Sequence, residues 1–162
     1  MTFMCNEREC VTRLQKALGL PDPWLAGVLH HWGFDDTCAD LLPWIPAISV
    51  AWIEGLTLAE HQRLVALIEQ RHRSLSPRAK VLLTAWLSDP PPAYLVRVAR
   101  RTLCEQLAGL HGAERDALHA RVLGPCEDIA RVSGGRFGFG AISAAEGVML
   151  RELSRRLSTA HR

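Results

Sequence analysis

The sequence predicts an all-α fold of about eight helices within 162 residues. Apolar residues recur at spacings of three and four, which is the period of an amphipathic helix. Capping signals precede most of these stretches, and no segment alternates apolar and polar residues between hairpin turns. Because hydrophobic residues make up 48% of the chain, we expect a packed core.

The N-terminal part of the chain predicts a pair of helices. Asn6 and Glu9 form a capping box before the first apolar stripe, which a glycine ends. Asp22 precedes a proline, and this dipeptide is typical of the start of a helix. We therefore expect an N-terminal helical extension over residues 1–35, followed by a helical domain over residues 36–162.

Two helices are expected next. The first covers residues 40–54, where Pro46 should kink the helix or delay its start because proline cannot donate a hydrogen bond in a helix interior. Thr57 and Glu60 then form a second capping box, which predicts a helix extending to about Arg71.

The last four helices have equally clear boundaries. They are expected over residues 77–87, 95–110, 113–132 and from 143 onward. Gly124 and Pro125 should break or bend the third of these, because proline removes one intrahelical hydrogen bond. Ser143 and Glu146 form a third capping box before the final helix.

Composition narrows the classes of protein to consider. The net charge of +2 is too small to indicate a nucleic-acid partner. The N-terminus has no signal-peptide pattern, and no apolar run has the length of a membrane span. Five cysteines at scattered spacings favour free thiols in a reducing compartment. We therefore expect a cytoplasmic protein without direct membrane insertion.

Basic residues nevertheless occur in three groups. They are Arg71, His72 and Arg73; Arg97, Arg100 and Arg101; and Arg151, Arg155 and Arg156. At helical spacing such groups are first interpreted as solvated helix faces, and second as sites for an anionic partner.

No motif predicts an enzyme. The glycine-rich stretch GGRFGFG, residues 134–140, lacks the lysine and the preceding strand of a phosphate-binding loop. The chain has no G-x-S-x-G motif for a nucleophilic serine and no C-x-x-C pair for zinc. We therefore predict a protein without catalytic activity.

A metal site is the one chemical function that the residues leave open. The segments WIEGLTLAE (52–60) and FGFGAISAAE (137–146) both place a glycine, an aliphatic residue and a Ser or Thr before x-x-Glu. Hard cations such as Ca²⁺, Mg²⁺ or Mn²⁺ take oxygen ligands from a loop and the helix that follows it. The candidate ligands are Glu54, Glu60, His61 and Glu146. The alternative is that Glu60 and Glu146 serve only as helix caps.

Three longer stretches carry a family resemblance. These are AISVAWIEGLTLAE, SPRAKVLLTAWLSDPPPAYLVRVARRTL and IARVSGGRFGFGAISAAEGVMLREL. Over about residues 40–158 the chain resembles the TerB-like tellurite-resistance family. The resemblance implies two pseudo-repeated helical units with acidic loops that are associated with metal binding. The family's Asp-Gly pairs correspond to Glu54-Gly55 and, without an acid, to Ser133-Gly134.

The resemblance leads to two alternative functions. The first is a non-enzymatic scaffold or sensor module in a stress-response or membrane-associated assembly, with a divalent metal at a partial site centred on Glu54 and Glu60. The second is a protein-binding adaptor whose metal site has decayed. A protein partner is expected in both cases.

Overall fold

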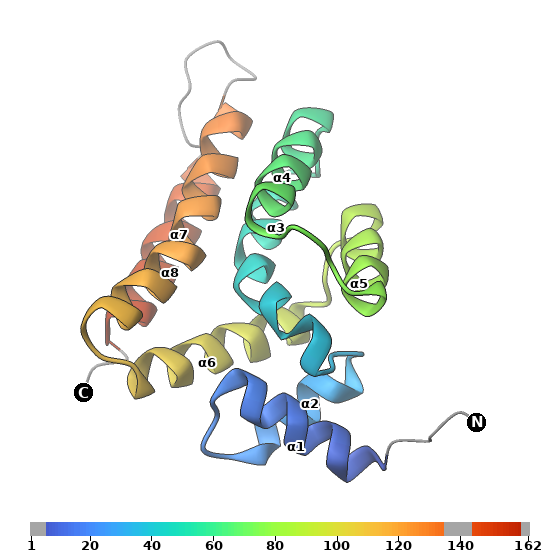
Figure 1. Ribbon diagram of the computed structural model, residues 1–162. Coiled ribbons are helices and arrows are strands. Elements are labelled where there is room, and N and C mark those ends of the chain that lie inside the picture. Colours follow the sequence, from blue (N-terminus) through green and yellow to red (C-terminus); the bar gives the residue numbers. More distant parts are fainter. Residues whose placement is uncertain (1–5, 135–143, 160–162) are drawn as a thin grey trace.

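The computed structural model describes residues 6–134 and 144–159, and these form eight α-helices, one 3₁₀ helix and no strand (Figure 1). The elements are α1 (Glu7–Leu18), α2 (Pro23–His31), η1 (Asp36–Trp44), α3 (Ile45–Ala51), α4 (Leu58–Arg71), α5 (Pro77–Ser88), α6 (Ala93–Gly109), α7 (Gly112–Gly134) and α8 (Ala144–Thr159). The predicted all-α fold is confirmed.

Local side-chain signals begin and end the first two helices as expected. The Asn6 side chain accepts a hydrogen bond from the backbone N–H of Arg8, and Asp22 accepts one from Trp24 at 2.7 Å. Gly19 ends α1 with φ of 64°, a left-handed conformation that favours glycine. The helical pair predicted in the N-terminal part of the chain is therefore present.

The helix predicted over residues 40–54 is replaced by two shorter elements. Asp35 caps the 3₁₀ helix η1 through Thr37, so helical structure begins several residues earlier than expected. Pro46 lies in the first turn of α3, where its missing N–H would have no intrahelical partner in any case. The single long helix was thus wrong, whereas the delayed start at Pro46 is confirmed.

Helix α7 continues through Gly124 and Pro125, so of the break or bend predicted there the break is absent. Proline at 125 removes the N–H that would bond the carbonyl oxygen of Arg121, four residues earlier. That oxygen instead accepts a hydrogen bond from Nη1 of Arg71 in α4, at 3.4 Å. A side chain from another helix therefore supplies a donor where the helix lacks one.

The core is centred on α3. Its residues Ile45, Ala47, Ile48 and Val50 are completely buried, and it packs against η1, α4, α6 and α7. Helices α1 and α2 contribute Leu14 and Leu29 to the same core. The side chain of Gln106 in α6 donates to the carbonyl oxygen of Leu18 at the end of α1, at 2.8 Å, and so joins the N-terminal pair to the rest.

The described helices include none with both the length and the apolar character that a bilayer crossing requires.

Candidate functional site

Glu60, the central residue of the predicted metal site, belongs to a complete capping box at the start of α4. Its Oε2 accepts hydrogen bonds from the backbone N–H of Thr57 at 2.7 Å and from the Thr57 hydroxyl at 2.6 Å. The Glu60 N–H points back to the Thr57 hydroxyl at 3.3 Å. Glu60 as a whole is only 3% exposed. The geometry is that of the capping alternative, which the sequence had left open.

The other predicted ligands are spread over this part of the chain. Glu54 is exposed in the turn after α3, and His61 is half-buried in the first turn of α4. Glu146 belongs to the first turn of α8, but its side chain lies outside the described part of the structure. Among the side chains that are described, no three His, Cys, Asp or Glu residues come together as a possible metal-binding group.

The two helices of the proposed repeat both pack against α7. Figure 1 shows α4 and α8 starting at the same end of the molecule, on different sides of α7. The segment from residue 135 to 143, which carries most of the second motif, lies outside the described residues. The pseudo-repeat therefore stays a prediction.

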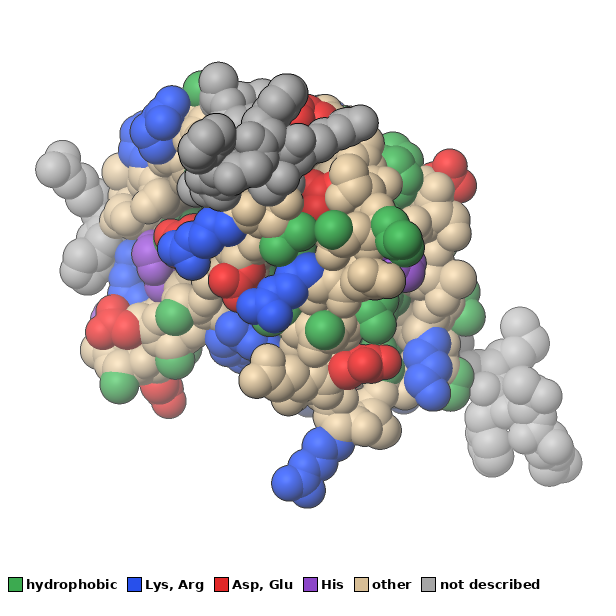
Figure 2. All heavy atoms as spheres, turned by 90° about the horizontal axis from the view of Figure 1, so that it is seen from above, with side chains coloured by type: hydrophobic (Ala, Val, Ile, Leu, Met, Phe, Trp, Pro, Cys, Tyr) green, Lys and Arg blue, Asp and Glu red, His purple; other side chains and the backbone are tan. Residues whose placement is uncertain are grey.

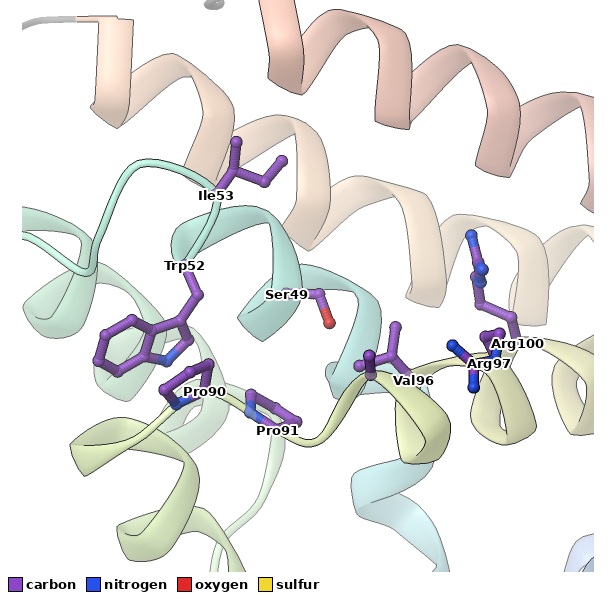
Figure 3. A pocket seen from close by; sticks show the side chains of 9 residues that line it. Ser49, Trp52, Ile53, Pro90, Pro91, Val96, Arg97 and Arg100 are labelled. Carbon is purple, nitrogen blue, oxygen red and sulfur yellow. The ribbon is translucent and has the colours of Figure 1, made fainter.

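A different site is formed along α6, and its apolar end is a cavity of about 360 Å³ (Figure 3). Three groups of residues line it: Ser49, Trp52 and Ile53 at the end of α3; Pro90 and Pro91 of the link to α6; and Ala93, Val96, Arg97 and Arg100 of α6 itself. Figure 3 shows Trp52 and the two prolines at one end and the two arginines at the other. The cavity is thus apolar at one end and cationic at the other.

The apolar end is held in place by defined contacts. The indole N–H of Trp52 donates to the carbonyl oxygen of Trp86, the third-last residue of α5, at 2.8 Å. The polyproline link between α5 and α6 has fixed backbone φ angles, because each proline ring restrains its own residue. A ligand that entered here would meet a surface with little conformational entropy to lose.

Arg97 and Arg100 also line a second cavity, of about 440 Å³, together with Arg101, Cys104, Arg156 and Thr159. The three α6 arginines share one helix face because they are three and four residues apart. Arg156 comes from α8, which packs against α6. We call the two adjoining cavities the α6 groove. Packing of α8 on α6 therefore brings four guanidinium groups to one end of this groove.

Arg100 differs from the other arginines of the α6 groove. Its Nε is buried and has no hydrogen-bond partner within the described part of the chain. Burial, followed by the charge of nearby Arg156, lowers the pKa of the Arg100 guanidinium. An arginine still remains protonated at neutral pH. The groove therefore holds a partly desolvated cation that an incoming anion would stabilise.

Aromatic and acidic neighbours position the remaining cations. The guanidinium of Arg97 lies 5.5 Å from the ring centre of Tyr94, and that of Arg101 lies 5.4 Å from the ring centre of Trp24.

Glu152 accepts hydrogen bonds from both Arg155 and Arg156, and these hydrogen bonds lower the pKa of its carboxyl group to about 2. Arg156 is thus partly neutralised, while the three α6 arginines form no ion pair with a described residue.

The described residues that line the α6 groove include one thiol, that of Cys104, and the hydroxyl groups of Ser49 and Thr159. Burial raises the pKa of this thiol, which keeps it protonated and weakly nucleophilic at neutral pH.

Charge is distributed differently elsewhere on the surface. On the face seen in Figure 2, acidic and basic side chains are interspersed with small apolar areas. This mixed pattern is that of a solvated surface. The convergence of arginines along α6 thus occurs in a chain whose net charge is only +2.

Sequence reasoning found part of this site. It grouped Arg97, Arg100 and Arg101, but assigned Arg156 to a separate group and did not place Trp52 near either. Comparison of the chain with protein-family models, curated proteins and solved structures gives no match.

Proposed function

We propose that this chain is a non-enzymatic protein-binding adaptor that holds an acidic segment of a partner protein in the α6 groove. This is the second of the two functions that the sequence leaves open. The supporting observation is that Arg97 and Arg100 join an apolar cavity beside Trp52 to a cavity with two further arginines. The matching segment has a large apolar side chain followed by carboxylates.

Each end of the groove would contribute in a different way. An apolar side chain that covers Trp52 and the two prolines gains about 25 cal/mol for each Å² removed from water. Carboxylates at the arginine end form charge-assisted hydrogen bonds, which are about twice as strong as neutral ones. Because Arg100 is already half-buried, a carboxylate that bonds its guanidinium displaces less water than it would at a fully exposed arginine.

A protein segment fits these groups better than a nucleic acid. A single-stranded nucleic acid binds through a long basic track with exposed aromatic rings for base stacking. Here the arginines are confined to one end of the groove, and the exposed rings of Tyr94 and Trp24 line neither of its two cavities. The chemistry that remains is one apolar contact next to a short acidic stretch.

The resemblance to TerB-like proteins supports the same broad class, namely a scaffold or sensor module in a stress-response assembly. The metal-binding form of that hypothesis requires a Glu60 carboxylate that is available to a cation. Because both hydrogen-bonding groups of Thr57 donate to this carboxylate, its geometry favours the adaptor.

Binding can be tested with a labelled synthetic peptide in which a leucine precedes a short run of glutamates. Fluorescence anisotropy should show saturable binding that weakens as salt is added, because exposed charges are screened. The double variant Arg97→Gln/Arg100→Gln should bind at least tenfold more weakly. The matched control Arg8→Gln/Arg151→Gln loses the same charge at two exposed positions outside the groove and should bind like the parent.

The peptide itself provides the second comparison. Replacing the leucine of the peptide by serine should weaken its binding to the parent protein. The factor by which Arg97→Gln/Arg100→Gln weakens binding should be the same for both peptides. The proposal is wrong if the two double variants lose affinity equally. It is also wrong if a single-stranded RNA of equal charge binds the groove more tightly than the peptide.

A further inference from the structure

A separate cavity of about 440 Å³ lies where η1, α4 and α7 meet. Asp40, Pro43 and Trp44 line it from η1, Arg71 and His72 from the end of α4, and Arg121 from α7. It shares no lining residue with the α6 groove. Any ligand of this cavity would therefore be independent of the proposed partner segment.

Arg71 is held in place on one side of the cavity. Its guanidinium lies 5.4 Å from the centre of the Trp44 ring, and its Nη1 donates to the carbonyl oxygen of Arg121 at 3.4 Å. A guanidinium has five N–H donors, so most of its hydrogen-bonding capacity remains after this contact. The guanidinium of Arg121 forms no hydrogen bond or ion pair with any residue the structure describes.

His72 adds a donor to the same cavity. The indole N–H of Trp44 donates to its Nε2 at 3.0 Å, so this nitrogen carries the lone pair and the ring proton of the neutral form is on Nδ1. Burial lowers the pKa of His72; the charges of Arg121 and Arg71 act in the same direction, and Asp40 opposes them. The ring is therefore neutral at neutral pH and offers an N–H without a charge.

The charges that line the cavity favour an anion. Two guanidinium groups face one carboxylate, that of the exposed Asp40. A helix C-terminus attracts cations, which gives Arg71 a structural role at the end of α4. The same reason does not apply to Arg121, which lies within α7 and away from its ends. The attraction of cations to a helix end therefore does not explain why Arg121 lines the cavity opposite α4.

We propose that this cavity binds a small oxyanion, namely phosphate or a phosphate monoester, between Arg71 and Arg121, with His72 as a neutral donor. Planar guanidinium groups match phosphate oxygens in pairs, which single ammonium groups do not. The volume of the cavity exceeds that of inorganic phosphate, so an organic group attached through an ester oxygen can be accommodated.

Isothermal titration with inorganic phosphate, at fixed ionic strength maintained with chloride, tests the site directly. The parent protein should show saturable binding. Arg121→Gln should weaken it at least tenfold, whereas Asp40→Asn should strengthen it severalfold because an opposing charge is removed. Arg121→Lys keeps the charge and should fall between Arg121→Gln and the parent. Arg151→Gln, an exposed charge change on α8, should have no effect.

Either of two results with these variants overturns the inference. One is binding that Arg121→Gln leaves unchanged while its circular dichroism matches the parent. The other is an Asp40→Asn variant that binds phosphate more weakly than the parent. Sedimentation with vesicles that contain phosphatidic acid distinguishes a lipid headgroup from a free anion. Protein that sediments with these vesicles but gives no heat with phosphate would also overturn the proposal.

Discussion

The guanidinium of Arg71 bonds the carbonyl oxygen of Arg121, the oxygen that proline at position 125 leaves without its helical donor. The distance from Nη1 to the oxygen is 3.4 Å, and the same guanidinium lies 5.4 Å from the centre of the Trp44 ring. The end of α4 is thereby joined to the middle of α7 and to η1. A sequence feature that normally interrupts a helix is here part of a contact between helices.

A double-mutant cycle measures this relationship. Arg71→Met in the parent should lower the free energy of unfolding by about 1 kcal/mol, because a carbonyl oxygen loses its donor. In the Pro125→Ala background the new N–H bonds that oxygen within the helix, so the same change should cost less. Urea denaturation of the four proteins provides the values. Strictly additive losses would show that Arg71 does not serve this carbonyl.

The pH dependence of stability should depend on His72. Its pKa is lowered in the folded protein, first by burial, so the unfolded chain binds the proton more readily. The associated stability is therefore complete above the unfolded value of about 6.5 and is lost as the pH falls below it.

His72→Gln provides the comparison, since its amide oxygen can still accept the Trp44 N–H. Denaturant unfolding between pH 5 and 7.5 should show a smaller loss of stability on acidification in this variant than in the parent. Parallel curves for the two proteins would assign the pH dependence to other groups.

The capping box at the start of α4 should make a measurable contribution to stability. Thr57→Ala removes a side chain that accepts from the Glu60 N–H and should cost about 1 kcal/mol. Glu60→Gln keeps an acceptor for the Thr57 N–H and should cost less. Thermal unfolding of both variants tests the order. A larger loss for Glu60→Gln than for Thr57→Ala would indicate a role for the charge itself.

Divalent cations separate the adaptor from the metal-binding scaffold. If Glu54 and Glu60 are ligands, a hundredfold excess of cation over Kd should stabilise the protein by about 2.7 kcal/mol. The adaptor proposal expects Ca²⁺, Mg²⁺ and Mn²⁺ to leave the melting temperature almost unchanged. It also expects Glu146→Gln to cost little, since glutamine still serves a capping box. A shift that Glu54→Gln abolishes would favour the metal-binding scaffold.

Helix starts were the features that could be predicted most fully from the sequence. Thr57 with Glu60, Asp22 and Asn6 each cap the helix that follows, as expected. These signals are local, because the side chain and the N–H that it bonds lie within three residues of each other. Neighbouring elements have little influence on them.

Features that depend on distant contacts were missed. The 3₁₀ helix η1 begins earlier than the predicted helix. Helix α7 continues through Pro125, and the carbonyl oxygen of Arg121 that this proline leaves free is bonded by Arg71, a residue fifty positions before Arg121. No periodicity in the sequence reports which side chain of another helix will reach a given backbone atom.

The candidate site likewise combines features that follow from local spacing with features that follow from contacts between distant parts of the chain. Sequence spacing alone placed Arg97, Arg100 and Arg101 on one face of a helix, because helical geometry relates residues three and four apart. Only the tertiary structure added Arg156 from α8 and Trp52 from the end of α3, and only burial left Arg100 Nε without a partner among the described residues. The sequence by itself determined the helices and their charged faces, since both follow from hydrogen bonds and spacings within one turn. Packing decided which faces meet around a cavity, since that depends on side-chain shapes far apart in the chain.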